Sequence, residues 1–394
     1  MMHSGDGLLD AVLSDEAGLR SVLREATRSP HAVVADWRWQ QLPGGSGAGT
    51  RLFRISGNAD AMGRRIPWTT IVKVLTRDVH SFESSSEDRD AWDYWKREWH
   101  VYRSSWQAAL PGPVVPPACY GTGEGRLEDD DEVLAWIAME DLGHIQHRLW
   151  PRDQWPTVAH QVGVFNGRYL SGEPMPAEPW LPTDWLRGWS EQSKPLIPDL
   201  EEVSSHPVSG RVLTRTTVSE LIWLWENRPH LYALLEELPR TFCHNDLHNR
   251  NLFVRDGDRP DCVAIDWALC GEGVIGQELS ALIGATLIFR GIRPEDGNQL
   301  EDVCLSAYTA GLRKTCPADP HQARLGYLLT VTLRFGLGSL PALIALTRDD
   351  QEADLIYRLF ECSYEEWLVH TARAMSFIAE RVRQLRETVG SPNT

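Results

Sequence analysis

Apolar runs in the first third of the chain predict β-strands. Residues 51–55 alternate between polar and apolar side chains, and residues 68–75 form a β-branched apolar run that contains one lysine, Lys73. A third apolar run covers residues 133–139. Period-two alternation and short β-branched runs are typical of strands, so this part of the chain predicts a sheet.

Apolar positions three and four residues apart predict helices elsewhere. Before the strands, the leucines and valines within residues 8–13 and 19–23 have this spacing. After the strands, six longer segments have it: 155–169, 216–238, 276–288, 299–312, 325–346 and 352–389. The second half of the chain is therefore expected to be mostly helical.

A stripe of aromatic residues lies between the second and third predicted strands. Its members recur at three- and four-residue steps and predict one more helix: Trp92, Trp95, Trp99, Tyr102 and Trp106. Such a stripe is the buried face of a helix in most proteins, so it indicates core packing and not a binding site.

The densest group of chemically useful residues is the sequence HNDLHNRN at positions 244–251. A short apolar run follows at 252–254, then a polar turn and a return strand at 262–265 that leads into Asp266. A hairpin of this kind would bring Asp246, Asn251 and Asp266 to one end, around one cleft.

These residue types match the needs of phosphoryl transfer from ATP. Magnesium prefers oxygen ligands and usually takes one or two protein carboxylates, which Asn251 and Asp266 can provide. Asp246, set between His244 and His248, would accept the proton of an acceptor hydroxyl. The alternative is that His244 and Asp246 only cap turns, but that does not explain the spacing to Asp266.

The same residues carry a resemblance to a known family. HNDLHNRN followed by AIDWA resembles the catalytic loop and metal-binding aspartate of the aminoglycoside phosphotransferase and choline kinase group. Those enzymes typically have HGDxHxxN and then IDW or IDF, and His248, two residues after Asp246, favours their small-molecule branch over protein kinases. Asn245 stands where the group most often has glycine, so its side chain would constrain the loop or narrow the site.

The resemblance implies a fold and a set of roles. The fold would be α+β and bilobal, protein-kinase-like, with a small N-terminal lobe built on an antiparallel sheet and a larger, mostly helical C-terminal lobe. His244, Asp246 and His248 would be catalytic, with His248 near the transferred group, and Asn251 and Asp266 would bind magnesium.

Kinase chemistry also requires a phosphate-covering loop, a lysine on a strand and an acidic partner on a helix, in that order. Gly45, Gly47 and Gly49 lie in a glycine-rich stretch that could cover the triphosphate, although its spacing is not that of the protein-kinase loop and ordinary loops look the same. Lys73 would pair with Glu98 to position the phosphates. Alternatively, Lys73 is an edge-strand lysine that blocks aggregation.

The strand at 133–139 would become the hinge between the lobes. In the resembled fold, backbone groups there bind adenine, which implies contacts at Met139, Glu140 and Leu142. The alternative is an ordinary core strand followed by a turn.

The resemblance also implies roles for two segments after the predicted hinge. Glu278 stands where the family often has an aspartate that braces the catalytic loop, and the same role is expected of it. The insert at 174–189 contains Trp180, Trp185 and Trp189 among prolines. It would form a variable wall of the acceptor site, with stacking on a sugar or an amine and core packing as the two uses of its tryptophans.

Length and motif order fit one enzyme of two lobes. The expected divisions are a helical extension at 1–34, a nucleotide-binding lobe at 35–142, and a helical lobe at 143–394 that holds the catalytic loop, metal and acceptor site. No long linker rich in proline and serine separates these parts of the 394-residue chain.

The charge and the cysteine content limit the classes of partner that the protein is expected to bind. The formal charge of −16 argues against nucleic acid and is compatible with a cationic acceptor. Seven scattered cysteines without a CxxC pair, together with no signal peptide or long apolar span, indicate a cytoplasmic protein that is reduced and neither zinc-binding nor membrane-bound.

The sequence therefore predicts a magnesium- and ATP-dependent kinase, with GTP as the alternative donor, acting on a hydroxyl of a small molecule. Aminoglycoside-like compounds, amino alcohols, sugars and secondary metabolites are the candidate acceptors. Two alternatives stay open: a peptide Ser/Thr kinase of a peptide natural-product pathway, and a nucleotide-binding pseudokinase scaffold without turnover.

Overall fold

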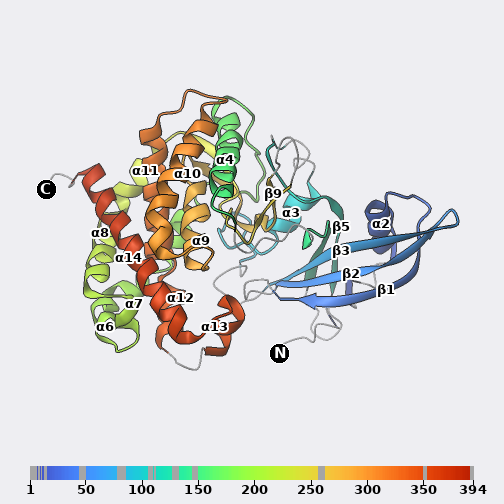
Figure 1. Ribbon diagram of the computed structural model, residues 1–394, viewed down its shortest axis with the longest axis horizontal. Helices are drawn as coiled ribbons and strands as arrows, with labels where there is room; N and C mark the ends of the chain where they lie inside the picture. Colours follow the sequence, from blue (N-terminus) through green and yellow to red (C-terminus); the bar gives the residue numbers. More distant parts are fainter. Residues whose placement is uncertain are drawn as a thin grey trace.

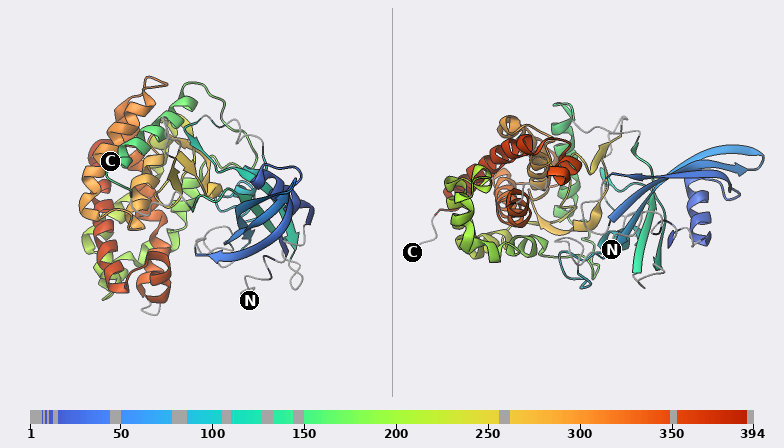
Figure 2. Two further views of the ribbon diagram at one scale, coloured as in Figure 1. Left: turned by 45° about the vertical axis from the view of Figure 1, so that its right-hand side comes forward. Right: turned by 90° about the horizontal axis from the view of Figure 1, so that it is seen from below.

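The computed structural model shows a small lobe built on a sheet beside a larger helical lobe (Figure 1). It describes residues 7, 9, 11–12, 16–43, 50–77, 86–104, 110, 112–126, 133–143, 150–255, 262–348 and 353–390. The predicted α+β, bilobal arrangement is confirmed. The sheet and the helical lobe are the two bodies that Figure 2 shows from two further directions.

The sheet of the small lobe has five antiparallel strands in the order β1-β2-β3-β6-β5. A two-residue turn at Met62 and Gly63 joins β2 to β3, and both residues have positive φ, as hairpin turns of this length require. The strands are β1 (Val33–Leu42), β2 (Thr50–Ala61), β3 (Arg64–Thr76), β5 (Cys119–Arg126) and β6 (Val133–Met139).

Helix α2 (Glu16–Thr27) packs against this sheet, as Figure 1 shows. Val22 of α2, with Leu9 and Val12 before it, is buried against Phe53 and Ile55 of β2. Because these side chains share one apolar cluster, the segment expected as a helical extension contributes to the core of the small lobe.

The aromatic stripe is buried as expected, but its helix is shorter than predicted. Helix α3 runs only from Arg97 to Arg103, and turns occupy the chain before it. Trp95 and Trp99 are buried in the main core, while Trp92 is half-buried. Trp106 lies outside the described residues. Turns can bury side chains at the same three- and four-residue spacing as a helix over a short stretch. The spacing alone therefore predicted a longer helix than the structure has.

The helical lobe contains all six predicted helical segments, three of them interrupted. Segment 276–288 is π-helical over Ser280–Ala285 before α9 (Thr286–Ile288), and a π-helical segment, Leu333–Gly338, separates α11 (Pro320–Thr332) from α12 (Leu340–Arg348). The third is divided into α13 (Ala353–Phe360) and α14 (Tyr364–Val389). The other helices are α4 (Gln154–Leu170), α5 (Trp185–Glu191), α6 (Leu200–Ser205), α7 (Ser209–Val212), α8 (Arg215–Glu236) and α10 (Gly297–Leu312).

Local chemistry explains the break before α14. Glu361 has positive φ, and Ser363 then caps the new helix by accepting a hydrogen bond from the backbone N–H of Glu366. The carboxylate of Glu366 accepts from the backbone N–H of Ser363 in return, which completes a capping box. The SxxE signal was present in the sequence, but the apolar period on both sides concealed it.

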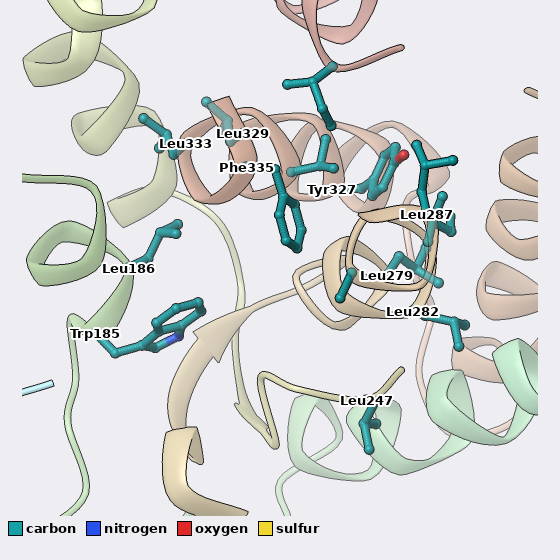
Figure 3. Close-up of a cluster of buried hydrophobic side chains, with 14 of the residues drawn as sticks. Trp185, Leu186, Leu247, Leu279, Leu282, Leu287, Tyr327, Leu329, Leu333 and Phe335 are labelled. Carbon is teal, nitrogen blue, oxygen red and sulfur yellow. The ribbon is translucent and has the colours of Figure 1, made fainter. Parts of the chain in front are cut away.

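The insert at 174–189 contributes to the core. Trp180 and Trp185 are buried in the main apolar cluster, and Trp189 packs edge-on against Trp92. Figure 3 shows Trp185 and Leu186 facing Phe335 and Leu333 in this cluster. Of the two uses expected for these tryptophans, the structure shows core packing.

The sequence was expected to contain no long apolar span, and this expectation was wrong. Pro320–Arg348 is long and apolar enough to cross a membrane, but 83% of its most apolar window is buried inside the protein. In this structure the segment is a core helix of the large lobe.

A buried ion pair ties α10 to α14 and yields a stability prediction. Arg381 donates from Nε to Glu301 Oε2 at 2.7 Å, and both side chains are 3% exposed. We expect Arg381→Ala to lower the unfolding free energy by about 3–5 kcal/mol, because buried Glu301 would lose its closest cation. Arg324, 4.0 Å from Oε1, is the more distant one that would remain. Chemical denaturation measures the change.

The control is the exposed pair Arg383–Glu380 on the same helix. Arg383→Ala should change the unfolding free energy by less than about 1 kcal/mol. Equal effects of the two substitutions would show that the buried pair has no special importance.

Candidate active site

Two strand pairs position the segment at 244–251. Strand β7 (Arg240–Cys243) leads into it and pairs with β10 (Gly271–Val274), while β8 (Leu252–Val254) leaves it and pairs with β9 (Cys262–Ala264). The hairpin predicted from the sequence is confirmed, and it carries Asp266 back beside the start of the segment.

The backbone at Asn245 explains how this loop tolerates a side chain at the position where glycine was expected from the resemblance. Its φ is +68°, in the left-handed region, which asparagine adopts more readily than other non-glycine residues. Its Nδ2 donates to the carbonyl of Leu269 at 2.9 Å, and its Oδ1 accepts from Gln277 at 2.6 Å. The side chain is buried, so it constrains the loop.

We expect both Asn245→Gly and Asn245→Ala to destabilise the protein, because each loses the two side-chain hydrogen bonds. The alanine variant should be the less stable of the two by about 1–2 kcal/mol, the cost of a left-handed conformation for a residue with Cβ. Denaturant unfolding of the matched pair measures the difference, and an alanine variant as stable as the glycine variant would contradict this account.

Glu278 braces the loop, which confirms the role expected of it. It is fully buried, and its carboxylate accepts hydrogen bonds from the backbone N–H groups of His244 and Asn245. Burial raises the pKa of Glu278 to about 8, against the two N–H donors, which favour the charged form.

This pKa gives a pH prediction with a definite sign. Because the folded pKa lies above the unfolded value, the contribution of Glu278 to stability is fully present below the unfolded pKa and is lost as pH rises through 8. Between pH 5 and 8 the wild type should lose up to about 1.4 kcal/mol per pH unit relative to Glu278→Gln. Unfolding measured across that range tests it, and parallel pH curves for the two proteins would refute it.

Both ring nitrogens of His244 contact backbone groups of the site. It is fully buried; Nδ1 accepts from the backbone N–H of Asp246 at 3.2 Å, and Nε2 donates to the carbonyl of Ile265 at 3.1 Å. Burial lowers the pKa of His244 to about 4, so the ring is neutral. With both nitrogens used by the backbone, His244 links the two halves of the site.

Asp246 is held on both carboxylate oxygens. Oδ1 accepts from Arg334 Nη2 at 2.6 Å, and Oδ2 accepts from Asn251 Nδ2 at 2.7 Å. Nε2 of His248 lies 3.4 Å from Oδ2. Although burial opposes ionisation, His248 and Arg334 hold the pKa of Asp246 well below its usual range.

Sequence reasoning missed Arg334. One signal could have found it: Arg334 is the only charged residue in the apolar run 325–346. A charge in such a run is costly to bury unless it is paired, so it points to a buried partner.

Lys73 joins the two lobes. Its Nζ lies 2.5 Å from Glu98 Oε2 in α3 and 3.0 Å from Asp266 Oδ1 in the large lobe. Burial opposes the charge, but the two carboxylates outweigh it and raise the pKa of Lys73, so the ammonium stays charged. The structure thus brings the predicted pair together and adds Asp266 to it.

A second buried cation fixes α3 beside the same region. Arg97 donates to the carbonyl oxygens of Trp180, Trp92 and Ala268, at 2.9, 2.8 and 2.8 Å. Ala268 follows Asp266 by two residues, so this contact ties the helix that carries Glu98 to the loop that carries Asp266. Arg97 was not recognised from the sequence.

Asn251 and Asp266 suit a hard divalent cation. Asn251 uses Nδ2 on Asp246, which leaves its Oδ1, and Asp266 uses Oδ1 on Lys73, which leaves its Oδ2. Across the described ranges no group of three or more His, Cys, Asp or Glu side chains could hold a metal ion. Two oxygen donors are the set expected for magnesium that is otherwise held by phosphates and water.

The predicted adenine-binding segment lies at the end of β6. The carbonyl of Met139 accepts from Thr70 Oγ1 at 2.9 Å, Leu142 is buried, and Glu140 pairs with Arg255 of the large lobe at 2.5 Å. Asp141 forms a two-point ion pair with Arg54 of β2. The segment is therefore anchored to both lobes. Gly45, Gly47 and Gly49 lie outside the described residues.

Comparison with known proteins then identifies the family. The sequence model of the Phosphotransferase enzyme family matches residues 105–317, more than half of the chain. The chain belongs to this phosphotransferase family. The matched region includes the whole 244–251 segment and Asp266, and it leaves out Lys73 and Glu98.

Solved structures provide more distant likenesses. They include amicoumacin kinase hAmiN in complex with AMP-PNP, Ca2+ and Ami (13% identity, TM-score 0.49, 93% of this chain and 96% of that one). They also include an ethanolamine kinase of Plasmodium vivax, with 10% identity, a TM-score of 0.47 and coverage of 89% of this chain and 83% of that one. Another is the choline kinase LicA from Streptococcus pneumoniae, with 14% identity, a TM-score of 0.43 and coverage of 92% of this chain and 99% of that one. The comparison with curated protein sequences gave no match.

Proposed function

We propose that this member of the phosphotransferase family transfers the γ-phosphoryl group of magnesium-bound ATP to a hydroxyl of a small molecule. The observation that carries the proposal is the position of Lys73, on a strand of the small lobe, between Glu98 and Asp266. This arrangement supports the proposal, because phosphoryl transfer needs a cation for the phosphates close to a metal ligand.

Each residue of the site then has a role that its contacts support. Lys73, held by Glu98, would bind the α- and β-phosphates. Oδ1 of Asn251 and Oδ2 of Asp266 would hold magnesium, which supplies neutralisation of the phosphate charge when bound. Asp246 would orient the acceptor hydroxyl and accept its proton, and His248 would lie beside the group transferred.

The charges of the protein indicate which class of acceptor it would bind. The overall charge of −16 favours a cationic compound, whereas Arg334 places a cation against Asp246 itself. A hydroxyl compound whose cationic groups lie away from the reacting hydroxyl satisfies both conditions. The screen therefore starts with aminoglycosides and amino alcohols, then sugars, and then Ser/Thr peptides, in a cytoplasm-like reducing buffer.

Two variants test the roles. Asp246→Ala should lower transfer by about 10²- to 10⁴-fold, the usual contribution of a general base, while nucleotide binding stays near wild type. Asp266→Asn should weaken nucleotide binding only when magnesium is present, because it removes a metal ligand. Calorimetric titration of ATP and GTP, with magnesium and with EDTA, is run beside a transfer assay.

Asp296→Asn is the matched control, since this carboxylate pairs with surface arginines on another part of the large lobe. It should leave binding and transfer unchanged. Wild-type transfer in both site variants would refute the assigned roles. Nucleotide binding by the wild type without transfer to any acceptor would instead support a nucleotide-binding scaffold without turnover.

A further inference from the structure

Arg334 lies in the core of the large lobe at an irregular point of its helix. It belongs to the π-helical segment Leu333–Gly338, between α11 and α12, and only 4% of it is exposed. Isolated π-helical segments inside α-helices occur frequently at functional sites, because the inserted residue redirects its neighbours. Here the segment directs a guanidinium to the catalytic loop.

The contacts of Arg334 converge on that loop. Nη2 donates to Asp246 Oδ1 at 2.6 Å, and Nη1 donates to the carbonyl of Asn245. The guanidinium lies over the rings of Trp185 and Phe335, 5.2 and 5.0 Å from their centroids, in the cluster drawn in Figure 3. Two hydrogen bonds and two ring contacts leave the guanidinium little freedom to turn.

A buried charge of this kind is hard to explain as a stabilising feature. Replacement of a buried ion pair by apolar residues of similar volume is often neutral for stability, and the cation here sits within a segment, 325–346, that has no other charge. What the guanidinium provides and an apolar side chain cannot is a fixed orientation of the Asp246 carboxylate.

We propose that Arg334 is a positioning residue of the phosphoryl transfer, one that holds Asp246 in the orientation in which it meets the acceptor hydroxyl. Arg334 engages Oδ1 and Asn251 engages Oδ2, so the plane of the carboxylate is fixed from two sides. Oδ1 is paired with the guanidinium, so the hydroxyl proton goes to Oδ2, which accepts one hydrogen bond from the neutral amide of Asn251 and has a second lone pair. This inference rests on the proposed role of Asp246 as base.

The test compares Arg334→Ala and Arg334→Lys with the wild type in the full-length chain. ADP release from magnesium-ATP is followed with the acceptor found in the screen and with water as acceptor. We expect Arg334→Ala to lower kcat by about 10²-fold, the order of loss that a misplaced catalytic group causes, with KM for ATP changed less than about threefold. Lysine keeps the charge but cannot make both contacts, so its kcat should be intermediate.

Chemical rescue separates positioning from a general structural effect. Guanidinium, added at concentrations well below those that unfold the protein, should raise kcat of Arg334→Ala at least tenfold and leave the wild type unchanged. Arg381→Ala is the matched control, because Arg381 is a buried arginine whose partner, Glu301, lies between helices away from the loop. Its kcat per folded molecule should not respond to guanidinium.

The outcomes distinguish this inference from the proposed function. If Asp246→Ala is inactive and Arg334→Ala keeps wild-type kcat, or loses it without rescue by guanidinium, Arg334 is not a positioning residue. If Asp246→Ala itself keeps wild-type kcat, the proposed function fails first. If Arg334→Ala does not fold, Arg334→Lys decides: wild-type kcat in that variant would overturn the two-contact geometry.

Discussion

The ammonium group of Lys73 is the interaction on which the two-lobed arrangement depends. It is buried, and within the described part of the chain it pairs with two carboxylates from different regions, Glu98 of α3 and Asp266 of the large lobe. Because a buried ammonium is costly without such partners, the position of β3 fixes the positions of α3 and of the loop after β9. Arg97 of α3 also donates to the carbonyl of Ala268, which is a second contact between α3 and the loop after β9.

The loop at 244–251 illustrates a different constraint, the need to satisfy buried backbone groups. Residues 244–251 are largely buried, yet they form neither helix nor strand, so their N–H and C=O groups need partners from side chains. Glu278 accepts from two of these N–H groups, His244 accepts from a third, and Arg334 donates to a carbonyl. The polar side chains around the loop thus act first as substitutes for secondary structure, and the geometry of Asp246 follows.

Much of this could be predicted from the sequence because it depends on local signals. The strand and hairpin around the 244–251 segment and the pairing of Lys73 with Glu98 follow from residue type and order along the chain, whereas the brace at Glu278 was implied by the resemblance to a known family. The helices were harder. An apolar period continues through the π-helical segment at 333–338 and through the break at 361–363, since both sides of each irregularity face the same core.

Arg334 and Arg97 show what order along the chain cannot predict. Each reaches its partners across long separations in sequence, and each looked from the sequence like a residue of an ordinary helix. Asn245 lies between these cases: its identity was a visible departure, but only the left-handed backbone shows why asparagine can replace glycine there.

The polar side chains of the candidate site are held in place by other side chains of the protein. Asp246 and Asp266 each give one carboxylate oxygen to a buried cation of the protein, Arg334 and Lys73 respectively. Asn251 gives its nitrogen to Asp246 and keeps its oxygen. Asp266 and Asn251 are thus each fixed through one atom while an oxygen remains for a ligand, and Asp246 is fixed through both of its carboxylate oxygens. Groups fixed in this way need little reorganisation during the reaction, and that preorganisation is the main source of rate enhancement available to an enzyme whose chemistry is mostly positioning and electrostatics.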